Sequence, residues 1–268
     1  MHLKRGLTGI IAIPLLIYVI GPGPRWLFYV ILYLVSIAGL VEFYRITSSN
    51  LPRFVRWSTY FLTLALYMLI YRRQVLFAPV LTLLWALTPM AYFMFTQPSP
   101  EKPWATEIGK AVLGPVYICI PISMVLHMDR FIPGGNLWIF LLLTSIFAND
   151  TGAFYFGKLF GRHKLYERVS PNKTWEGAIG GLALSVVASF WFMKIFHIHA
   201  VNLKGFILVL SMAVSGQIGD LAESMLKRNQ GIKDSGGILP GHGGMLDRID
   251  ALLFAIPILY VYLSISIV

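Results

Sequence analysis

One helix-length run near the C-terminus carries side chains that can hold a metal ion and a phosphate. The segment SGQIGDLAESMLKR places Asp220, Glu223, Ser224 and Lys227 at helical spacing. At 100° per residue, these four side chains fall within about one third of the helix circumference. Two carboxylates, a hydroxyl and an ammonium group side by side either satisfy one another or bind a cation and an anion. The residues that follow favour the second interpretation.

A second pair of acids begins the next apolar run. Asp247 and Asp250 stand three residues apart, so they share one side of a helix. If this helix packs antiparallel to the preceding one, Asp220 comes close to Asp247. Hard cations such as Mg²⁺ bind carboxylate oxygens and keep water and substrate phosphates as their other ligands. The sequence therefore predicts a metal site between the ends of two helices.

The loop between these helices, GIKDSGGILPGHGGMLDRID over residues 231–250, is polar and contains six glycines. Glycines permit close backbone approach, so that N–H groups can point at phosphate oxygens. Lys227, Arg228, Lys233 and Arg248 add positive charge for the same anion. A merely flexible linker has no need of this density of charged residues, which favours a site for a nucleoside triphosphate.

An acidic residue also lies deep in an earlier apolar run. Asp150 in ANDTGAFYFGK is interpreted as a metal ligand or an orienting group beside the same site, with a plain helix–helix hydrogen bond as the alternative. The same stretch contains Gly152, Gly157 and Lys158 in the spacing of a phosphate-binding P-loop. Because Leu159 replaces the required Ser or Thr and no strand precedes the pattern, we reject a P-loop.

A third polar stretch, ERVSPNKTWEG, precedes another apolar run. Either Ser170 or Thr174 can cap the helix that follows. Asn172 and Lys173 then stand at a helix N-terminus, where N–H groups and the macrodipole favour an anion. His242, embedded among the loop glycines, fits a loop hydrogen bond and a substrate contact equally well.

Apolar runs of membrane-spanning length must position these residues. Hydrophobic residues make up 57% of the 268, charged residues only 13%, and the mean hydropathy is +0.70, whereas soluble domains carry about a quarter charged residues. Because a spanning helix needs roughly 20 apolar residues, we expect an all-α, polytopic integral membrane protein with about nine transmembrane helices. The expected spans are residues 6–21, 26–44, 57–71, 75–96, 108–127, 137–156, 175–195, 205–226 and 247–267.

The distribution of positive charge predicts the orientation of the chain. With nine spans and a cytoplasmic N-terminus, sixteen of the 22 Lys and Arg residues face the cytoplasm, in line with the positive-inside rule. The loop at 231–250 then also faces the cytoplasm. The net charge of +10 resides in short loops rather than in a basic domain. We therefore expect contact with anionic lipid headgroups and no nucleic-acid partner.

A few isolated residues have ordinary interpretations. Glu42, near Arg45 at a span end, is expected to form a local ion pair. Cys119 is expected to be a small buried side chain, and because it is the only cysteine it excludes an intrachain disulfide and a paired-cysteine metal site. Gly177 and Gly181, in G-x-x-x-G spacing, favour close helix packing and are also compatible with a homodimer.

The C-terminal motifs resemble those of the phosphatidate cytidylyltransferase family, also called CDP-diacylglycerol synthases. The family signature reads Ser-x-apolar-Lys-Arg, Lys-Asp, Pro-x-His-Gly-Gly and Asp-Arg-apolar-Asp, and this chain follows it throughout residues 224–250. The segments NDTGAFYFGK and SPNKTWEG are similar to further family stretches. The matching signature positions are Ser224, Lys227, Arg228, Lys233, Asp234, Gly236, Pro240, His242, Gly243, Gly244, Asp247, Arg248 and Asp250.

The resemblance implies that CTP and phosphatidate react to CDP-diacylglycerol and pyrophosphate in the cell (inner) membrane, with the active site facing the cytoplasm. It further implies that Asp220 and Asp247 hold Mg²⁺, with Asp150 as a further candidate ligand and a second cation nearby. The residues expected to act in catalysis are Asp220, Asp247, Lys227, Lys233 and Asp250. The residues expected to bind the two substrates are Lys173, Asn172, Ser224, Arg228, Asp234, His242, Gly243, Gly244 and Arg248.

The same resemblance divides the chain into N-terminal transmembrane helices, residues 1–130 with about five spans, and C-terminal catalytic helices, residues 131–268. A CTP-dependent lipid kinase, in which a lipid hydroxyl takes the γ-phosphoryl group, is the nearest alternative. A secondary transporter also carries intramembrane acids, but no inverted repeat is visible and the acids cluster toward one face. A CDP-alcohol phosphotransferase is set aside because its Asp-Gly-x-x-Ala-Arg pattern is missing.

Overall fold

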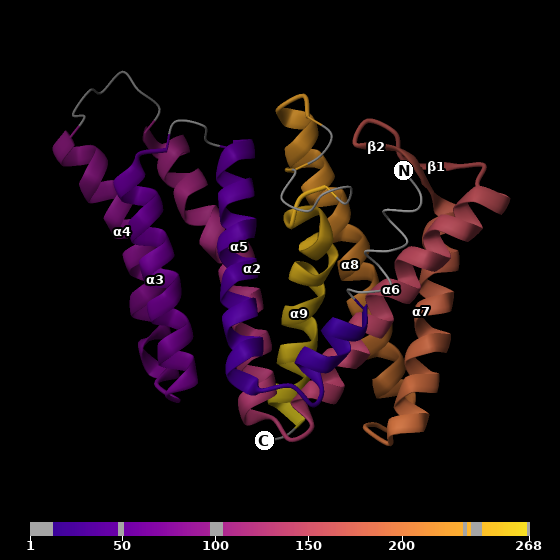
Figure 1. Cartoon of the computed structure of the whole chain (residues 1–268). Helices are drawn as coiled ribbons and strands as arrows, with labels where there is room; N and C mark the ends of the chain where they lie inside the picture. The colour runs from indigo at the N-terminus through magenta and orange to yellow at the C-terminus, as the bar shows by residue number, and fades with distance from the viewer. Residues whose placement is uncertain (1–12, 48–50, 97–103, 233–234, 237–242, 267–268) are drawn as a thin grey trace. The chain divides into compact units, whose positions relative to one another are not determined.

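Helices make up most of the structure, a computed structural model that describes residues 13–47, 51–96, 104–232, 235–236 and 243–266 (Figure 1). Among these residues, eight helices are long and apolar enough to cross a membrane. The all-α, polytopic membrane fold is thus confirmed. The first expected span, 6–21, lies partly outside the described residues. Its described part is helical over residues 13–20. The helices are α2 (Arg25–Thr47), α3 (Arg53–Tyr71), α4 (Ala78–Thr96, after the short 3-10 helix η1, Val75–Phe77), α5 (Trp104–Phe131), α6 (Gly135–Phe160), α7 (Trp175–Phe196), α8 (Leu203–Asn229) and α9 (Leu246–Ser266).

The polar stretch before α7 forms a small hairpin that hydropathy does not predict. Strand β1 (Lys164–Tyr166) pairs antiparallel with β2 (Ser170–Thr174). The side chain of Thr174 accepts a 3.2 Å hydrogen bond from the backbone N–H of Gly177, and this bond satisfies one of the unpaired donors of the first helical turn. Thr174, and not Ser170, is therefore the N-cap of α7.

The chain divides into two compact units whose segments alternate along the sequence. The N-terminal unit contains residues 1–127 and 234–246, and the C-terminal unit contains residues 128–233 and 247–268. The described loop residues 235–236 and 243–245 therefore belong to the first unit, whereas α8 and all of α9 after Leu246 belong to the second. The functional division expected near residue 130 stays a prediction.

Within the N-terminal unit, polar and small side chains join the helices. The hydroxyl of Tyr44 on α2 donates a 2.8 Å hydrogen bond to the carbonyl oxygen of Ala111 on α5, and the hydroxyls of Ser36 and Tyr67 lie 2.6 Å apart between α2 and α3. A Cβ at Gly114 would lie only 3.0 Å from the ring of Tyr44. These contacts hold α2 against α3 and α5.

Within the C-terminal unit, α6 and α7 pack closely through glycines. A Cβ at Gly152 would lie 2.8 Å from the carbonyl oxygen of Gly180, and a Cβ at Gly181 would lie 2.6 Å from the carbonyl oxygen of Asn149. The backbones can approach this closely only because these positions lack side chains. The close-packing interpretation of the glycine spacing is thus confirmed, whereas the homodimer stays a prediction.

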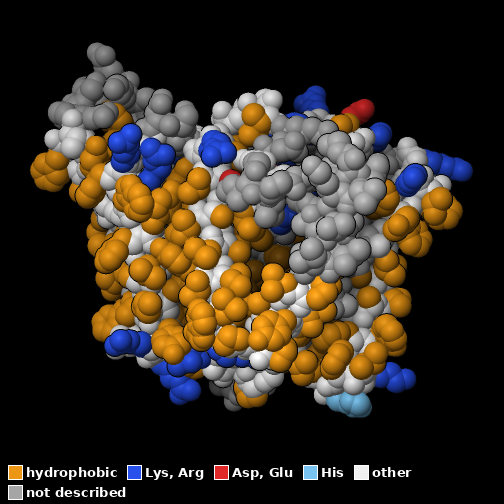
Figure 2. All heavy atoms as spheres, viewed as in Figure 1, with side chains coloured by type: hydrophobic (Ala, Val, Ile, Leu, Met, Phe, Trp, Pro, Cys, Tyr) orange, Lys and Arg blue, Asp and Glu red, His pale blue; other side chains and the backbone are white. Residues whose placement is uncertain are grey.

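The described surface of the helices is largely apolar. Figure 2 shows hydrophobic side chains over most of the described surface in view, with Lys and Arg gathered toward helix ends. Large side chains such as Phe61, Phe95 and Trp191 are exposed. A water-soluble protein rarely exposes contiguous apolar surface on this scale, so lipid is the environment that this surface fits.

Candidate active site

A cavity in the C-terminal unit lies among α6, α7, α8 and the β1–β2 hairpin. Its volume is about 520 Å³, within the roughly 300–1,000 Å³ typical of small-molecule sites. Phe154 and Leu165 contribute to its apolar part. The polar residues that line it are Asn149, Asp150, Lys158, Ser170, Asn172, Lys173, Thr174, Gln217 and Asp220.

Strand β2 and helix α8 bring an ion pair into this cavity. The Nζ atom of Lys173 lies 2.5 Å from Oδ2 of Asp220, and the hydroxyl of Ser224 donates a 3.5 Å hydrogen bond to Oδ1 of the same carboxylate. The side chains of Lys173 and Asp220 are 27% and 37% exposed. Both charged groups are therefore accessible to a ligand in the cavity.

Asp150 lines the same cavity from α6. Its side chain is exposed at the cavity wall and lies within electrostatic range of Asp220 and Lys173. Two carboxylates and one lysine thus face the same space. This placement suits either of the roles expected for Asp150 near the site, and which of them it performs stays a prediction.

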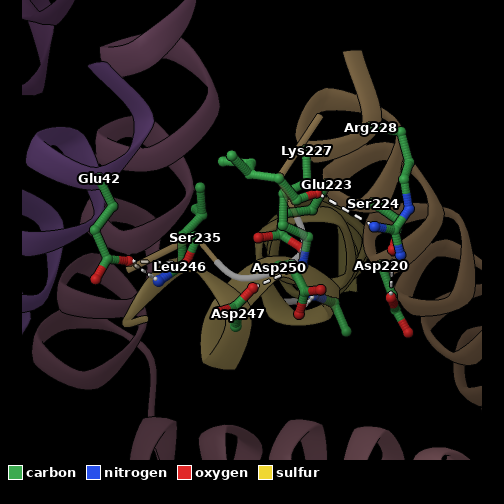
Figure 3. A network of polar contacts seen from close by, with 12 residues as sticks. Glu42, Asp220, Glu223, Ser224, Lys227, Arg228, Ser235, Leu246, Asp247 and Asp250 are labelled. Carbon is green, nitrogen blue, oxygen red and sulfur yellow. Dashed lines mark hydrogen bonds and ion pairs between the residues drawn. The ribbon is translucent and has the colours of Figure 1, made fainter. Parts of the chain in front are cut away.

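A second charged cluster joins α8 to the start of α9 (Figure 3). The Nζ atom of Lys227 lies 2.6 Å from Oδ1 of Asp247 and also forms an ion pair with Glu223, one helical turn earlier. The three side chains are nearly buried: Lys227 is 12%, Asp247 13% and Glu223 1% exposed. Because a buried charge without a partner is costly, this lysine compensates two carboxylates.

Helices α8 and α9 run antiparallel in this region, as the sequence predicts. Lys227 contacts Asp247, a Cβ at Gly219 would lie 2.5 Å from the carbonyl oxygen of Asp250, and Gly216 approaches Ala251. Residue numbers therefore fall along α8 as they rise along α9. Asp250 is buried, and its Oδ1 accepts a 2.7 Å hydrogen bond from the N–H of Ala251. Asp150, Asp220 and Asp250 all lie within electrostatic range of one another.

Comparison with known proteins assigns this chain to a family. A sequence model described as the cytidylyltransferase family matches residues 3–266, almost the whole chain. The chain belongs to the cytidylyltransferase family. The resemblance carried by the signature at 224–250 is therefore confirmed.

Individual relatives in this family carry a more specific name. The phosphatidate cytidylyltransferase of Bacillus subtilis (strain 168) is 39% identical over 158 residues, which cover 59% of this chain and 59% of that protein. The phosphatidate cytidylyltransferase of Staphylococcus aureus (strain COL) is 47% identical over 132 residues, which cover 48% of this chain and 50% of that protein. The matches thus span only about half to three fifths of the relatives' length.

The remaining signature residues lie on the surface, in the glycine loop or outside the described residues. Arg228 is exposed, and its guanidinium donates 3.3 Å hydrogen bonds to the backbone oxygens of Val169 and Ile232. Arg248 is exposed on the first turn of α9. Gly243 has a positive φ of 79°, which favours glycine. Three expected site residues lie outside the described residues: Lys233, Asp234 and His242.

Two amide side chains in the cavity were not singled out from the sequence. Nε2 of Gln217 donates hydrogen bonds of 2.9 Å to Oδ1 of Asn149 and 3.0 Å to the carbonyl oxygen of Ala178. These bonds join α6, α7 and α8 directly beside the Lys173–Asp220 pair. Gln217 precedes Asp220 by one helical turn, and that spacing is the signal that could have found it.

Proposed function

We propose that the protein transfers the cytidylyl group of CTP to phosphatidate, which gives CDP-diacylglycerol and pyrophosphate at the cytoplasmic face of the cell membrane. Support comes from family membership together with one observation, the ion pairs that β2, α8 and α9 assemble from Lys173, Asp220, Lys227 and Asp247. Lysines that pair with carboxylates are groups that can also bind phosphates when substrate arrives.

The chemistry needs alignment and charge neutralisation more than a strong base. An oxygen of the phosphatidate phosphate attacks the α-phosphorus of CTP, the bond from that phosphorus to the bridging oxygen of the β-phosphate breaks, and pyrophosphate leaves with the electron pair. A phosphate monoester is already anionic at neutral pH, so a strong general base is not required. Positioned cations should therefore supply most of the catalysis.

We propose that these carboxylates bind a magnesium ion whose remaining ligands come from substrate. Among the described residues, no group of three or more His, Cys, Asp or Glu side chains is arranged to hold a metal ion. Mg²⁺ is often bound by one or two carboxylates and fills its other positions with water and substrate phosphates. We propose that Asp220 and Asp247 hold it, with Asp150 beside them. When bound, Mg²⁺ would stabilise negative charge on the phosphates, alone or with a second cation.

In this proposal, the two lysines change partners as substrates bind. Lys173, released from Asp220, and Arg248 contact the lipid phosphate, and Asn172, which precedes Lys173 in the chain, also lines the cavity. Lys227, Arg228, Lys233 and the backbone N–H groups of the glycine loop neutralise the triphosphate as it breaks. Ser224, Asp234, Asp250 and His242 orient these groups or bound water.

The cavity also has an apolar part that suits a lipid substrate. Phe154 lines it and is 63% exposed, so an apolar ring is accessible for contact with acyl chains. The acyl chains of phosphatidate could then remain in lipid while its headgroup reaches Lys173. The headgroup would meet CTP without leaving the membrane.

Product analysis tests the proposal against the lipid kinase. Purified protein is incubated with phosphatidate and CTP labelled either in cytidine or at the γ-phosphate, with and without Mg²⁺, and the lipids are separated by chromatography. We expect cytidine label in the lipid, pyrophosphate in solution and no product without a divalent ion. Transfer of the γ-label to lipid with release of CDP would replace nucleotidyl transfer by a kinase reaction.

A further inference from the structure

Glu42 on α2 is a fully buried acid of the N-terminal unit. The sequence suggests an ion pair with Arg45, yet Arg45 is exposed and Glu42 has no exposed surface. Its Oε2 instead accepts a 2.8 Å hydrogen bond from the backbone N–H of Leu246 and a 3.1 Å hydrogen bond from the hydroxyl of Ser235 (Figure 3). The carboxylate therefore contacts both described ends of the segment 235–246.

Two glycines of that segment, Gly236 and Gly244, allow the close approach of the Glu42 carboxylate. A Cβ at Gly236 would lie 2.5 Å from Oε1 of Glu42, and a Cβ at Gly244 would lie 2.5 Å from Oε2. Real Cβ atoms do not approach oxygen this closely, so any side chain at either position would displace Glu42 or the backbone. The close approach gives these two glycines a structural reason in addition to the proposed phosphate contacts of the loop backbone.

The position of Leu246 gives the contact its physical meaning. Leu246 is the first residue of α9, so its N–H is one of the donors that a helix start leaves without a partner inside the helix. A carboxylate that accepts this N–H also interacts favourably with the positive end of the helix dipole. Because Glu42 lies 204 residues away from Leu246, the start of α9 is capped from a distant helix.

We propose that Glu42 is a positioning residue for the nucleotide site. By binding both ends of the segment 235–246, it fixes the residue at which α9 begins, and Asp247 follows Leu246 directly in the chain. Asp247 is the acid that pairs with Lys227 and that the proposed function assigns to the metal. The inference rests on that proposed function, and it gives the N-terminal unit a part in activity beyond residence in the membrane.

The first test compares Glu42→Ala and Glu42→Gln with the wild type. Glu42→Ala removes the acceptor, so we expect faster hydrogen exchange at Leu246 and a kcat reduced at least tenfold, with a melting temperature within a few degrees of wild type. Glu42→Gln keeps one acceptor oxygen and should restore most of the protection and activity. Wild-type exchange and kinetics in Glu42→Ala would overturn the proposal, as would a loss of activity that only follows the unfolded fraction.

A second test uses Gly236, whose backbone lies directly against the Glu42 side chain. The three nearest atoms to a Cβ at Gly236 all belong to Glu42, so Gly236→Ala should lower kcat in the wild type and cause no further loss in Glu42→Ala. Gly109→Ala is the matched control, because a Cβ there meets no atom within 4 Å. Additive effects of Gly236→Ala and Glu42→Ala would overturn the proposal, even if Glu42→Ala alone proved unstable.

The two proposals can fail separately. If the wild type makes no CDP-diacylglycerol from CTP and phosphatidate, the proposed function is wrong whatever Glu42 does. Hydrogen exchange at Leu246 does not depend on the reaction. Unchanged protection there in Glu42→Ala would refute the role of Glu42 and leave the proposed function intact.

Discussion

Two lysine–aspartate pairs of the C-terminal unit share their chemistry but differ in their surroundings. Lys173 and Asp220 are both more than a quarter exposed, whereas Lys227, Asp247 and Glu223 are nearly buried. Exposed ion pairs contribute about 0–1 kcal/mol to stability, but removal of one partner from a buried pair costs about 3–5 kcal/mol. The comparison indicates that the first pair is suited to exchange with a ligand, while the second also holds α8 against α9.

The largest effect should come from the buried lysine. Lys227→Met leaves two carboxylates without their cation, so we expect the free energy of unfolding to fall by about 3–5 kcal/mol. Denaturant unfolding in detergent micelles measures it. Lys173→Met is the matched control and should change stability by no more than about 1 kcal/mol. Equal losses in the two variants would remove the distinction between the pairs.

Next in size is the loss of turnover without Asp220. Asp220→Ala should lower kcat at least a hundredfold, which corresponds to about 2.7 kcal/mol, because a proposed metal ligand is gone. Its exposed pair contributes little to folding, so the melting temperature should change little. Asp247→Ala should lose as much activity, and it should also lower stability because Asp247 is buried against Lys227. Near wild-type turnover in either purified variant would refute the metal roles.

A smaller effect is expected from the exposed lysine. Lys173→Ala should reduce kcat/KM for phosphatidate at least tenfold, or about 1.4 kcal/mol, at nearly unchanged stability. Steady-state kinetics with each substrate varied in turn would show which of them the lysine contacts. Unchanged kinetics for both substrates would place Lys173 outside the site and leave its pair with Asp220 as a surface feature.

The smallest effect is expected from the amide side chains that lie beside the Lys173–Asp220 pair. Gln217→Ala removes hydrogen bonds to Asn149 and to the backbone of Ala178, and a typical intramolecular hydrogen bond contributes about 0.5–1.5 kcal/mol. We expect a loss of stability of that order, visible in thermal unfolding. A loss as large as that of Lys227→Met would mean that the cavity is held together as firmly as the buried cluster.

Hydropathy and helical spacing were sufficient to predict the eight spans found among the described residues and the polar face of α8. Asp220 and Ser224 share that face in the structure, as do Glu223 and Lys227. Side-chain periodicity within a helix is a local property, so one sequence contains it. The antiparallel packing of α8 and α9 could also be predicted, because a connection of about twenty residues between consecutive spans favours it.

Contacts between distant residues could not be predicted in this way. The hairpin at 164–174 is short and polar and lacks the alternation that marks a strand, so only its pairing reveals it. Glu42 looked like a neighbour of Arg45, because local spacing does not reveal which side of α2 faces a segment some 200 residues later. The partners of Lys227 could not be predicted either, because its ammonium group can pair with a phosphate as well as with a carboxylate.

The alternation of the two units along the chain limits how the protein can be divided. The described residues 235–236 and 243–246 belong to the N-terminal unit although they are inserted between two parts of the C-terminal unit. A fragment that ends at residue 127 would contain Glu42 but lack Ser235 and Leu246, which donate hydrogen bonds to it. A fragment that begins at residue 128 would contain these donors without their acceptor. Two separately expressed halves should therefore regain function only when they are produced together, so that each completes the other during membrane insertion.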